Sequence, residues 1–152
     1  SAGVAVIHVG GSTEVEMTER KHRIEDALEA VRSAQEQGIV TGGGTALLRS
    51  SRSLCVQADS SEQALGAAVV QIACEEPIRQ MALNAGLSPD LMVEKVLHAA
   101  EEDGVDFRSG DLINMSTAGI IDPVKVTLTA LTNAASCAGT LITTNYGIIQ
   151  TE

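Results

Sequence analysis

The sequence predicts a mainly α-helical fold with short β-strands near both ends and a long helix ahead of the helical body. The apolar share is 44%, yet Phe107 and Tyr146 are the only aromatic residues, so Ala, Val, Leu and Ile must build the core. Such small aliphatic side chains suit closely packed helices. Capping signals and apolar residues at helical spacing recur along the chain. At 152 residues, the chain has the size of one domain and can bury a core.

The acidic charge balance of the chain makes negatively charged binding partners unfavourable. A net charge of −10 and a pI near 4.6 make nucleic acid and anionic membrane surfaces poor partners. The scarcity of aromatic residues argues against a base-stacking surface. No segment is apolar and long enough to span a bilayer, and residues 1–4 lack a basic signal-peptide start. Three cysteines in apolar surroundings indicate buried thiols of a reducing compartment: Cys55, Cys74 and Cys137.

The first element expected is a strand. Residues 4–9 form a β-branched run that ends at two glycines, which is typical of a strand. A long helix follows, because Thr13 and Glu16 fit a capping box and Gly38 fits a stop. One apolar stripe runs along this helix, with charged residues mostly off it: Ile24, Ala27, Leu28, Val31 and Ala34. We therefore expect a solvated arm with a narrow contact face.

Three consecutive glycines, Gly42, Gly43 and Gly44, divide this arm from the rest of the chain. Glycine permits a sharp turn and a close approach of the backbone to another group. If a helix follows, its first amide groups favour an anion. The run fits neither a dinucleotide fingerprint nor a P-loop, and the pattern alone favours a tight loop between packed helices. Both interpretations stay open on the pattern alone.

The body after the glycines predicts four helices and one irregular segment. Residues 64–74 are apolar nearly all round, which is typical of a buried central helix. Residues 105–121 are interpreted as a loop or a small hairpin. The expected helices run from Thr45 to about Arg49, from Ser61 to Asn84 with a kink at Pro77, from the Ser88 cap to Gly104, and from Asp122–Pro123 to about Gly139.

A terminal strand is expected over residues 146–150. Neither this strand nor the one at 4–9 has an obvious pairing partner within the chain. We therefore expect other polypeptide to complete the fold.

Motifs for several kinds of chemistry are absent. His8, His22 and His98 lie far apart and near no cysteine or carboxylate at ligand spacing, so no metal site is expected. The patterns GxSxG, HExxH and CxxC do not occur. Residue patterns alone therefore indicate a helical, acidic domain with a glycine loop.

Several stretches together carry a more specific resemblance. Residues 3–10, 13–17, 23–30 and 38–47 resemble, in order and spacing, the group I chaperonins of the GroEL type. The similarity continues through 77–80, 84–86, 119–126 and 142–144. It covers essentially all 152 residues but corresponds only to the last part of such a protein. We therefore expect a C-terminal fragment of an ATP-dependent chaperonin that assists protein folding in ring assemblies.

The resemblance implies a division into two parts. Residues 1–37 would be the C-terminal segment of the intermediate domain, with the lower hinge at Gly38. Residues 38–152 would be the C-terminal half of the equatorial ATP-binding domain.

The resemblance also implies roles for individual residues. Asp26 corresponds to the catalytic carboxylate. Gly42–Gly44 would approach the nucleotide through the backbone, most closely at Gly43. Asp106 would line the adenine, and Asp122 would bind the ribose while also capping the last helix. ATP and Mg²⁺ are the cofactors implied for the complete protein, although no metal ligand is assigned to this chain.

The sequence departs from this family at the base pocket. Val105 stands where the family usually has an aromatic residue, and Phe107 and Arg108 replace small ones. The phosphate loop with its magnesium-holding aspartate, and the apical domain, belong to sequence outside this chain. The chain alone is therefore expected to be inactive in hydrolysis.

The implied partners are the remainder of the subunit, neighbouring subunits of a homo-oligomeric ring, a co-chaperonin and unfolded polypeptides. Glu14 and Arg79 match subunit and ring contacts, and the strand around Ile148 would pair with a neighbour. The compartment would be the bacterial cytoplasm or an organelle matrix. A non-enzymatic module that self-associates or docks onto chaperonin rings remains the alternative.

Overall fold

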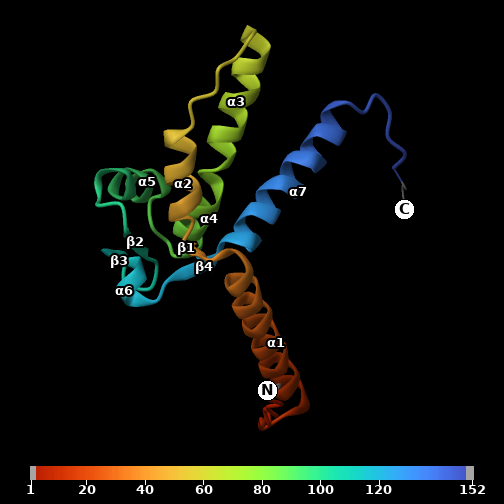
Figure 1. Cartoon of the computed structure of the whole chain (residues 1–152), viewed down its shortest axis with the longest axis vertical. Coiled ribbons are helices and arrows are strands. Elements are labelled where there is room, and N and C mark those ends of the chain that lie inside the picture. Colours follow the sequence, from red (N-terminus) through yellow and green to blue (C-terminus); the bar gives the residue numbers. More distant parts are fainter. Residues whose placement is uncertain (1–2, 150–152) are drawn as a thin grey trace.

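A computed structural model describes residues 3–149. Three helices extend from a small central body like arms: α1 points one way, α3 the opposite way and α7 to the side (Figure 1). The mainly helical fold class is therefore confirmed. In chain order the elements are α1 (Glu14–Gln37), β1 (Ile39–Thr41), α2 (Thr45–Ser53), α3 (Ser61–Ala73), α4 (Glu76–Asn84), α5 (Pro89–His98), β2 (Asp103–Asp106), β3 (Asp111–Asn114), α6 (Met115–Ala118), β4 (Ile121–Pro123) and α7 (Val124–Ile142).

Helix α1 has the predicted bounds. The Thr13 hydroxyl accepts a hydrogen bond from the Glu16 amide at 3.2 Å, and the Glu16 carboxylate accepts one from the Ser12 amide at 2.8 Å. These bonds satisfy backbone donors that the first turn leaves free. At the other end, Gly38 has φ of +83° and donates to the Ala34 carbonyl at 2.8 Å. Since left-handed backbone suits glycine, the helix stops there.

A two-stranded sheet joins the two halves of the chain. β1 pairs antiparallel with β4, and Val40 lies opposite Asp122. The Val124 amide extends the ladder by donating to the Gly38 carbonyl at 3.1 Å. Beside the sheet, Lys125 forms an ion pair with Glu36 at the end of α1. These contacts fix the starts of α2 and α7 next to the end of α1.

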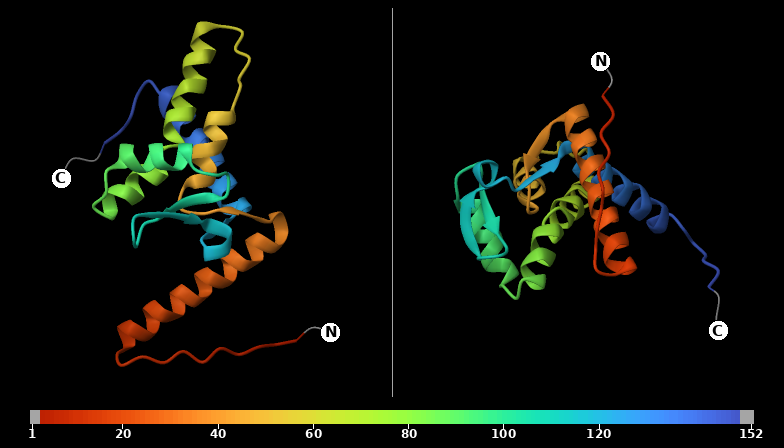
Figure 2. Two further views of the ribbon diagram at one scale, coloured as in Figure 1. Left: turned by 90° about the vertical axis from the view of Figure 1, so that its left-hand side faces the viewer. Right: turned by 90° about the horizontal axis from the view of Figure 1, so that it is seen from below.

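The core lies among α2, α4, α5 and β2. These elements belong to the body from which the longer helices project (Figure 2). As predicted, it is almost wholly aliphatic, and Phe107 packs against its edge. Its buried members are Leu48, Ile78, Ala82, Met92, Val93, Val96 and Val105.

The irregular segment after α5 contains the small hairpin that the sequence allowed. β2 pairs antiparallel with β3, with Asp103 opposite Asn114. Arg49 from α2 fastens it by donating to the carbonyls of Val96, Ala100 and Asp103 at 2.9, 2.6 and 3.0 Å. A guanidinium is favoured here because the carbonyls at a helix C-terminus carry partial negative charge.

Two strand predictions are wrong within the described residues. Residues 4–9 and 146–149 have no strand pairing, and the rest of the second prediction, Gln150, lies outside the described range. A strand forms only when a partner satisfies its backbone groups, and neither segment finds one here.

The prediction of one kinked helix from Ser61 to Asn84 is also corrected. α3 ends at Ala73, and α4 begins afresh with Pro77 in its first turn, where its missing amide costs nothing. α3 is not the buried helix that its composition predicted: Leu65, Val69 and Ile72 are 67, 63 and 63% exposed.

Three smaller predictions change as well. α2 continues to Ser53, beyond its predicted end at about Arg49. α5 ends at His98 and does not reach Gly104 as predicted, because Gly104 belongs to β2. Only one thiol is buried, that of Cys74, and its burial raises its pKa. Cys55 and Cys137 are exposed.

Gly104 is required by packing. A Cβ there would lie 2.6 Å from Thr45 Oγ1 and 2.9 Å from Met115 Sδ. We expect Gly104→Ala to lower the free energy of unfolding by about 1–3 kcal/mol, the usual cost of overpacking. Urea unfolding followed by circular dichroism measures it.

Gly66→Ala is the matched control. Its Cβ would meet nothing within 4 Å, and it lies inside α3. Alanine should therefore stabilise the chain by about 0.5–1 kcal/mol through helix propensity. Equal effects at both positions would contradict the packing argument.

Candidate functional site

The glycine loop is a tight turn between β1 and α2. The Gly42 amide donates to the Ile120 carbonyl at 3.0 Å, and the Gly42 carbonyl accepts from the Thr45 amide at 3.1 Å. Gly43 and Gly44 have φ of +64° and +74°, a left-handed conformation that glycine adopts at little cost. Among the described residues, neither of these two amides donates a recorded hydrogen bond.

Packing accounts for two of the three glycines. A Cβ on Gly42 would lie 3.1 Å from the Ile120 carbonyl oxygen, and one on Gly44 would lie 2.9 Å from the Ile78 amide nitrogen. The interpretation as a tight packed loop therefore holds for both. Gly43 differs, because a Cβ there would meet side chains, with Met115 Cε at 3.1 Å.

Gly43 borders a pocket of about 590 Å³. This volume lies within the range of about 300–1,000 Å³ that small-molecule sites occupy. The walls come from the loop, α4, the β2–β3 hairpin and the turn after α6. The lining residues are Gly43, Met81, Val105, Asp106, Phe107, Arg108, Ala118, Gly119 and Ile120.

Asp106 lines this pocket, as predicted, but it also shapes the hairpin. Its Oδ1 accepts a hydrogen bond from the Arg108 amide at 2.9 Å, and its carbonyl accepts from the Gly110 amide at 2.7 Å. These bonds fix the carboxylate at the rim and leave Oδ2 for other partners. Arg108 is the one cationic residue among those that line the pocket.

Asp122 stands apart from the pocket lining. It lies in β4 opposite Val40, so it does not cap α7; Pro123 occupies the N-cap position without a side-chain bond. The cap prediction is therefore wrong, because the sheet takes Asp122. Desolvation raises the pKa of its carboxyl group.

Asp26 is not brought to the pocket. It is exposed on α1, and its surroundings are α1 side chains such as His22 and Glu29. Eleven residues of helix separate it from Gln37, which is roughly 16 Å at 1.5 Å per residue. Any role at the pocket would require α1 to move about its junction with β1.

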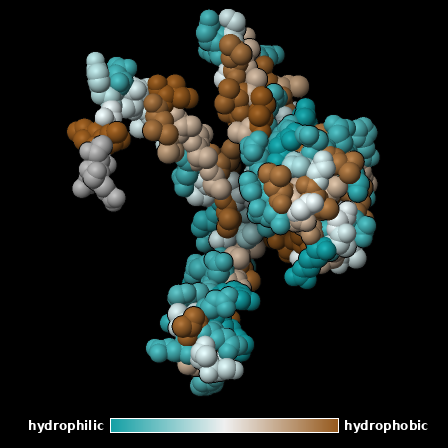
Figure 3. All heavy atoms as spheres, turned by 180° about the vertical axis from the view of Figure 1, so that it is seen from behind, coloured by the Kyte–Doolittle hydropathy of each residue, from teal (hydrophilic) through white to brown (hydrophobic). Residues whose placement is uncertain are grey.

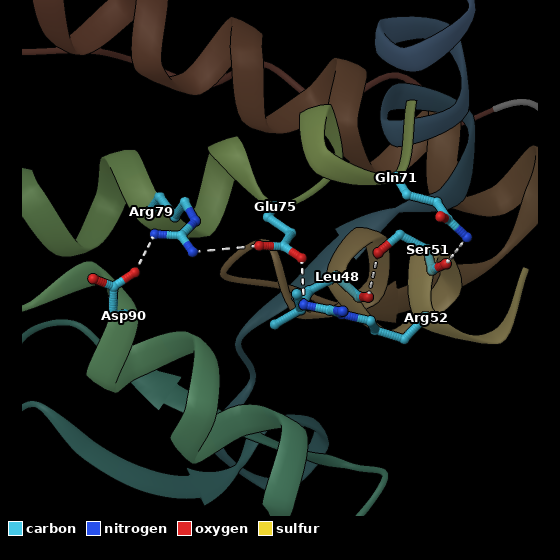
Figure 4. A network of polar contacts seen from close by, with 7 residues as sticks. All are labelled: Leu48, Ser51, Arg52, Gln71, Glu75, Arg79 and Asp90. Carbon is cyan, nitrogen blue, oxygen red and sulfur yellow. Dashed lines mark hydrogen bonds and ion pairs between the residues drawn. The ribbon is translucent and has the colours of Figure 1, made fainter. Parts of the chain in front are cut away.

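The side chain of Arg79 forms ion pairs with two carboxylates of the same chain (Figure 4). Its guanidinium pairs with Asp90 of α5 at 2.7 Å and with Glu75 at 3.4 Å. Glu75, whose side chain is 12% exposed, also accepts from Arg52 of α2 at 2.6 Å. These bonds raise the pKa of Arg79, above all the one to Asp90. The network links α2, α4 and α5, whereas Glu14 lies exposed in the first turn of α1.

Sequence reasoning missed part of the pocket. Met81 was not singled out, because a methionine in a helix carries no signal of its own. Gly119 and Ile120 lay inside a recognised stretch without an assigned role, and the antiparallel pairing of β1 with β4 would have pointed to them.

The described residues show little sign of a metal site. Within 3–149, no three His, Cys, Asp or Glu side chains gather in a way that could hold an ion. None of the helices in that range has the length and apolar character to cross a membrane. Of the two glycines whose amides make no recorded hydrogen bond, Gly43 lines the pocket and Gly44 packs against Ile78 instead.

Comparisons with known proteins agree with this arrangement. The family model described as the TCP-1/cpn60 chaperonin family matches residues 1–152. The fold is similar to the crystal structure of a group III chaperonin in the open state, with a TM-score of 0.78 and 27% sequence identity. The match covers 92% of this chain and 30% of that one, so the chain spans less than a third of that protein.

The raised pKa of Asp122 gives a pH-dependent prediction. The folded chain holds the proton of the Asp122 carboxyl group more tightly than the unfolded chain does. The contribution of this group to stability is therefore complete below about pH 3.8, the ordinary pKa of the group. It is lost as the pH rises through the higher pKa of the folded chain. We expect Asp122→Asn to raise the free energy of unfolding at pH 7 and to lose this advantage in acid.

Urea unfolding at several pH values measures this difference. Asp26→Asn, an exposed change on α1, is the control and should alter stability little at any pH. A destabilised Asp122→Asn at neutral pH would contradict the assignment of desolvation as the cause.

Proposed function

Because the chain belongs to the TCP-1/cpn60 chaperonin family, we propose that it forms the C-terminal part of an ATP-dependent, group I-type chaperonin subunit. Residues 1–37 are the returning segment of its intermediate domain, and 38–152 are half of its equatorial domain. The observation that carries this proposal is the pocket behind Gly43, with Gly43, whose amide makes no recorded hydrogen bond, on one wall and the Asp106 hairpin on another.

The chain contributes a backbone wall to the nucleotide site. The amides of Gly43 and Gly44 lie at the start of α2, where helix dipole and free donors favour a phosphate. Gly43 lets the nucleotide approach the backbone, because a side chain at this position would occupy the space between the loop and the Met115 side chain. Asp106 contacts the base and Asp122 the ribose, from the two strands that border the loop.

Hydrolysis depends on the joint at Gly38. Its φ of +83° and ψ of −167° are nearly exclusive to glycine, and in this proposal Gly38 is the position about which α1 turns. Rotation of α1 about this joint would carry Asp26 toward the pocket, where a carboxylate orients the attacking water. Coupling the carboxylate to domain closure makes phosphoryl transfer conditional on that motion.

The remaining partners follow from the family. The rest of the subunit supplies the phosphate loop and the magnesium ligands, and neighbouring subunits of a ring cover Glu14 and the segment around Ile148. Co-chaperonin and unfolded clients act through the parent, in the bacterial cytoplasm or an organelle matrix. The alternative, a non-enzymatic module that self-associates or docks onto rings, is favoured by one observation: residues 146–149 form no helix or strand and are exposed.

Nucleotide contact can be tested on the chain itself by NMR. We expect millimolar ATP to shift the amide signals of Gly43, Asp106 and Gly119 and to leave those of α7 unchanged. Gly43→Ala should remove these shifts, because its Cβ enters the pocket and its φ becomes strained.

Gly139→Ala is the matched control, since its Cβ meets nothing within 4 Å. It should keep the shifts intact. Shifts confined to α1 or α7, or a Gly43→Ala chain that responds like the unchanged one, would contradict the proposed site.

Hydrolysis by the chain alone gives a second test. Without a phosphate loop and magnesium ligands, we expect no phosphate release above background in a steady-state assay with Mg-ATP. Turnover that Asp26→Ala abolishes would show that 152 residues suffice, and would overturn the assignment of the missing ligands to the rest of the subunit.

A further inference from the structure

The pocket behind Gly43 is lined by residues that this chain itself supplies. Apolar side chains gather along α3 and α7, the arms that diverge from the body (Figure 3), and the proposed function leaves those faces to the rest of the subunit. The pocket differs, because the glycine loop, α4, the β2–β3 hairpin and the turn after α6 form its walls. A ligand in the pocket therefore meets side chains of this chain.

The pocket has polar side chains at two of its lining residues, Asp106 and Arg108. The other lining residues are glycines or have apolar side chains, such as Met81, Val105 and Ile120. A few placed polar groups in an otherwise apolar pocket usually fix the orientation of the ligand. Asp106 and Arg108 are therefore the side chains that can read the edge of a base.

Asp106 offers hydrogen-bond acceptors and no donor. Its Oδ1 accepts from the Arg108 amide at 2.9 Å, which fixes the carboxylate on the hairpin. Within residues 3–149, its Oδ2 has no recorded hydrogen bond or ion pair. Each carboxylate oxygen can accept more than one hydrogen bond, so a ligand with two neighbouring donors can bond to both oxygens. The best match for Asp106 is therefore a pair of donors.

Arg108 offers donors and no acceptor. Its side chain is exposed, and no ion pair of its guanidinium is recorded in the described part of the chain. The hairpin register nevertheless places Asp106 directly opposite Asp111, and like charges in such a pair are unfavourable. Since neither of these carboxylates takes up Arg108, its guanidinium remains able to donate to a ligand.

Phe107 supplies an aromatic face beside the glycine loop. Its Cε2 would lie 3.8 Å from a Cβ on Gly43, and the ring also packs against the core. Stacking on an aromatic ring stabilises every base, because each base has a π-face. Phe107 therefore holds a base without selecting one, and the selection falls to Asp106 and Arg108.

The edges of the two purine bases differ in what they present to these side chains. Guanine carries two neighbouring donors, N1–H and the 2-amino group, and the O6 acceptor beside them. Adenine carries one amino donor beside N1, whose lone pair would face a carboxylate oxygen unfavourably. A carboxylate and a guanidinium together therefore match the guanine edge better than the adenine edge.

We propose that the pocket behind Gly43 prefers guanine nucleotides to adenine nucleotides, and that Asp106 and Arg108 determine this specificity. Asp106 accepts hydrogen bonds from N1–H and the 2-amino group of guanine, while Arg108 donates to O6. This inference rests on the nucleotide site of the proposed function and names the base that this site holds best. ATP binds in the same place as the weaker ligand.

NMR titrations of the unchanged 152-residue chain with GTP and with ATP test the preference. The amide shifts of Gly43, Asp106 and Gly119 give a dissociation constant for each nucleotide. We expect the GTP constant to be lower by at least about five-fold, the lower end of what one bidentate base contact contributes. Inosine triphosphate lacks the 2-amino group and should lose most of this advantage.

Asp106→Asn tests the pair of acceptors. Asparagine keeps an oxygen for the Arg108 amide and replaces the other oxygen by an amide donor. GTP should bind to this variant more weakly by at least about five-fold. Xanthosine triphosphate, which carries a carbonyl in place of the 2-amino group, should bind to it more tightly than GTP does. A variant that is merely misfolded cannot gain a ligand in this way.

Two further variants complete the comparison. Arg108→Ala should weaken GTP binding more than ATP binding, because guanine has the O6 acceptor and adenine does not. Asp111→Asn is the matched control, since it removes the same charge from the same hairpin at a residue outside the pocket lining. This control should keep the preference of the unchanged chain.

Three results would overturn the proposal. If ATP binds as tightly as GTP or more tightly, the base preference is wrong and the nucleotide site of the proposed function stands. If neither nucleotide shifts the pocket amides, both are wrong. Equal losses of GTP affinity in Asp106→Asn and Asp111→Asn would assign the effect to net charge and not to hydrogen bonding with the base.

Discussion

The antiparallel pairing of β1 with β4 is the contact on which the other features depend. It brings Val40 opposite Asp122, residues more than 80 positions apart in the chain. Because β1 follows α1 and leads through the glycine loop into α2, while β4 leads into α7, the pairing places the end of α1 beside the starts of α2 and α7. The bond from the Gly42 amide to the Ile120 carbonyl then closes the loop against the turn that precedes β4. The wall of the pocket is thus a consequence of strand pairing.

Polar contacts hold the helical body around that sheet. Arg49 binds three carbonyls at the junction of α5 and β2, and Glu75 joins Arg52 to Arg79. Arg49 and Arg79 are half-buried and Arg52 is exposed, and their directional bonds to carbonyl and carboxylate groups tie α2, α4, α5 and β2 together. The hairpin that carries Asp106 is held in place in this way, and so is the pocket that it borders.

The three arms give the chain a different character from that of a compact domain. α1 is charged and self-sufficient in its capping, whereas α3 and α7 are apolar and lack cover. The charged surface of α1 suits contact with solvent, and the apolar surfaces of α3 and α7 suit contact with other polypeptide. The body between the arms holds the pocket behind Gly43, and Asp106 supplies the carboxylate among its lining residues.

Local rules by themselves determined the elements whose signals are local. The Thr13 cap and the Gly38 stop follow from side-chain hydrogen bonding and φ preference, neither of which needs distant residues. Only the tertiary structure decided that Asp122 belongs to a strand, that α3 lies exposed and that Met81 lines the pocket. Each of these outcomes depends on which distant segment comes to lie beside the residue. The apolar residues of α3 specify that the helix needs a partner, but its pattern is the same whether that partner is present or absent.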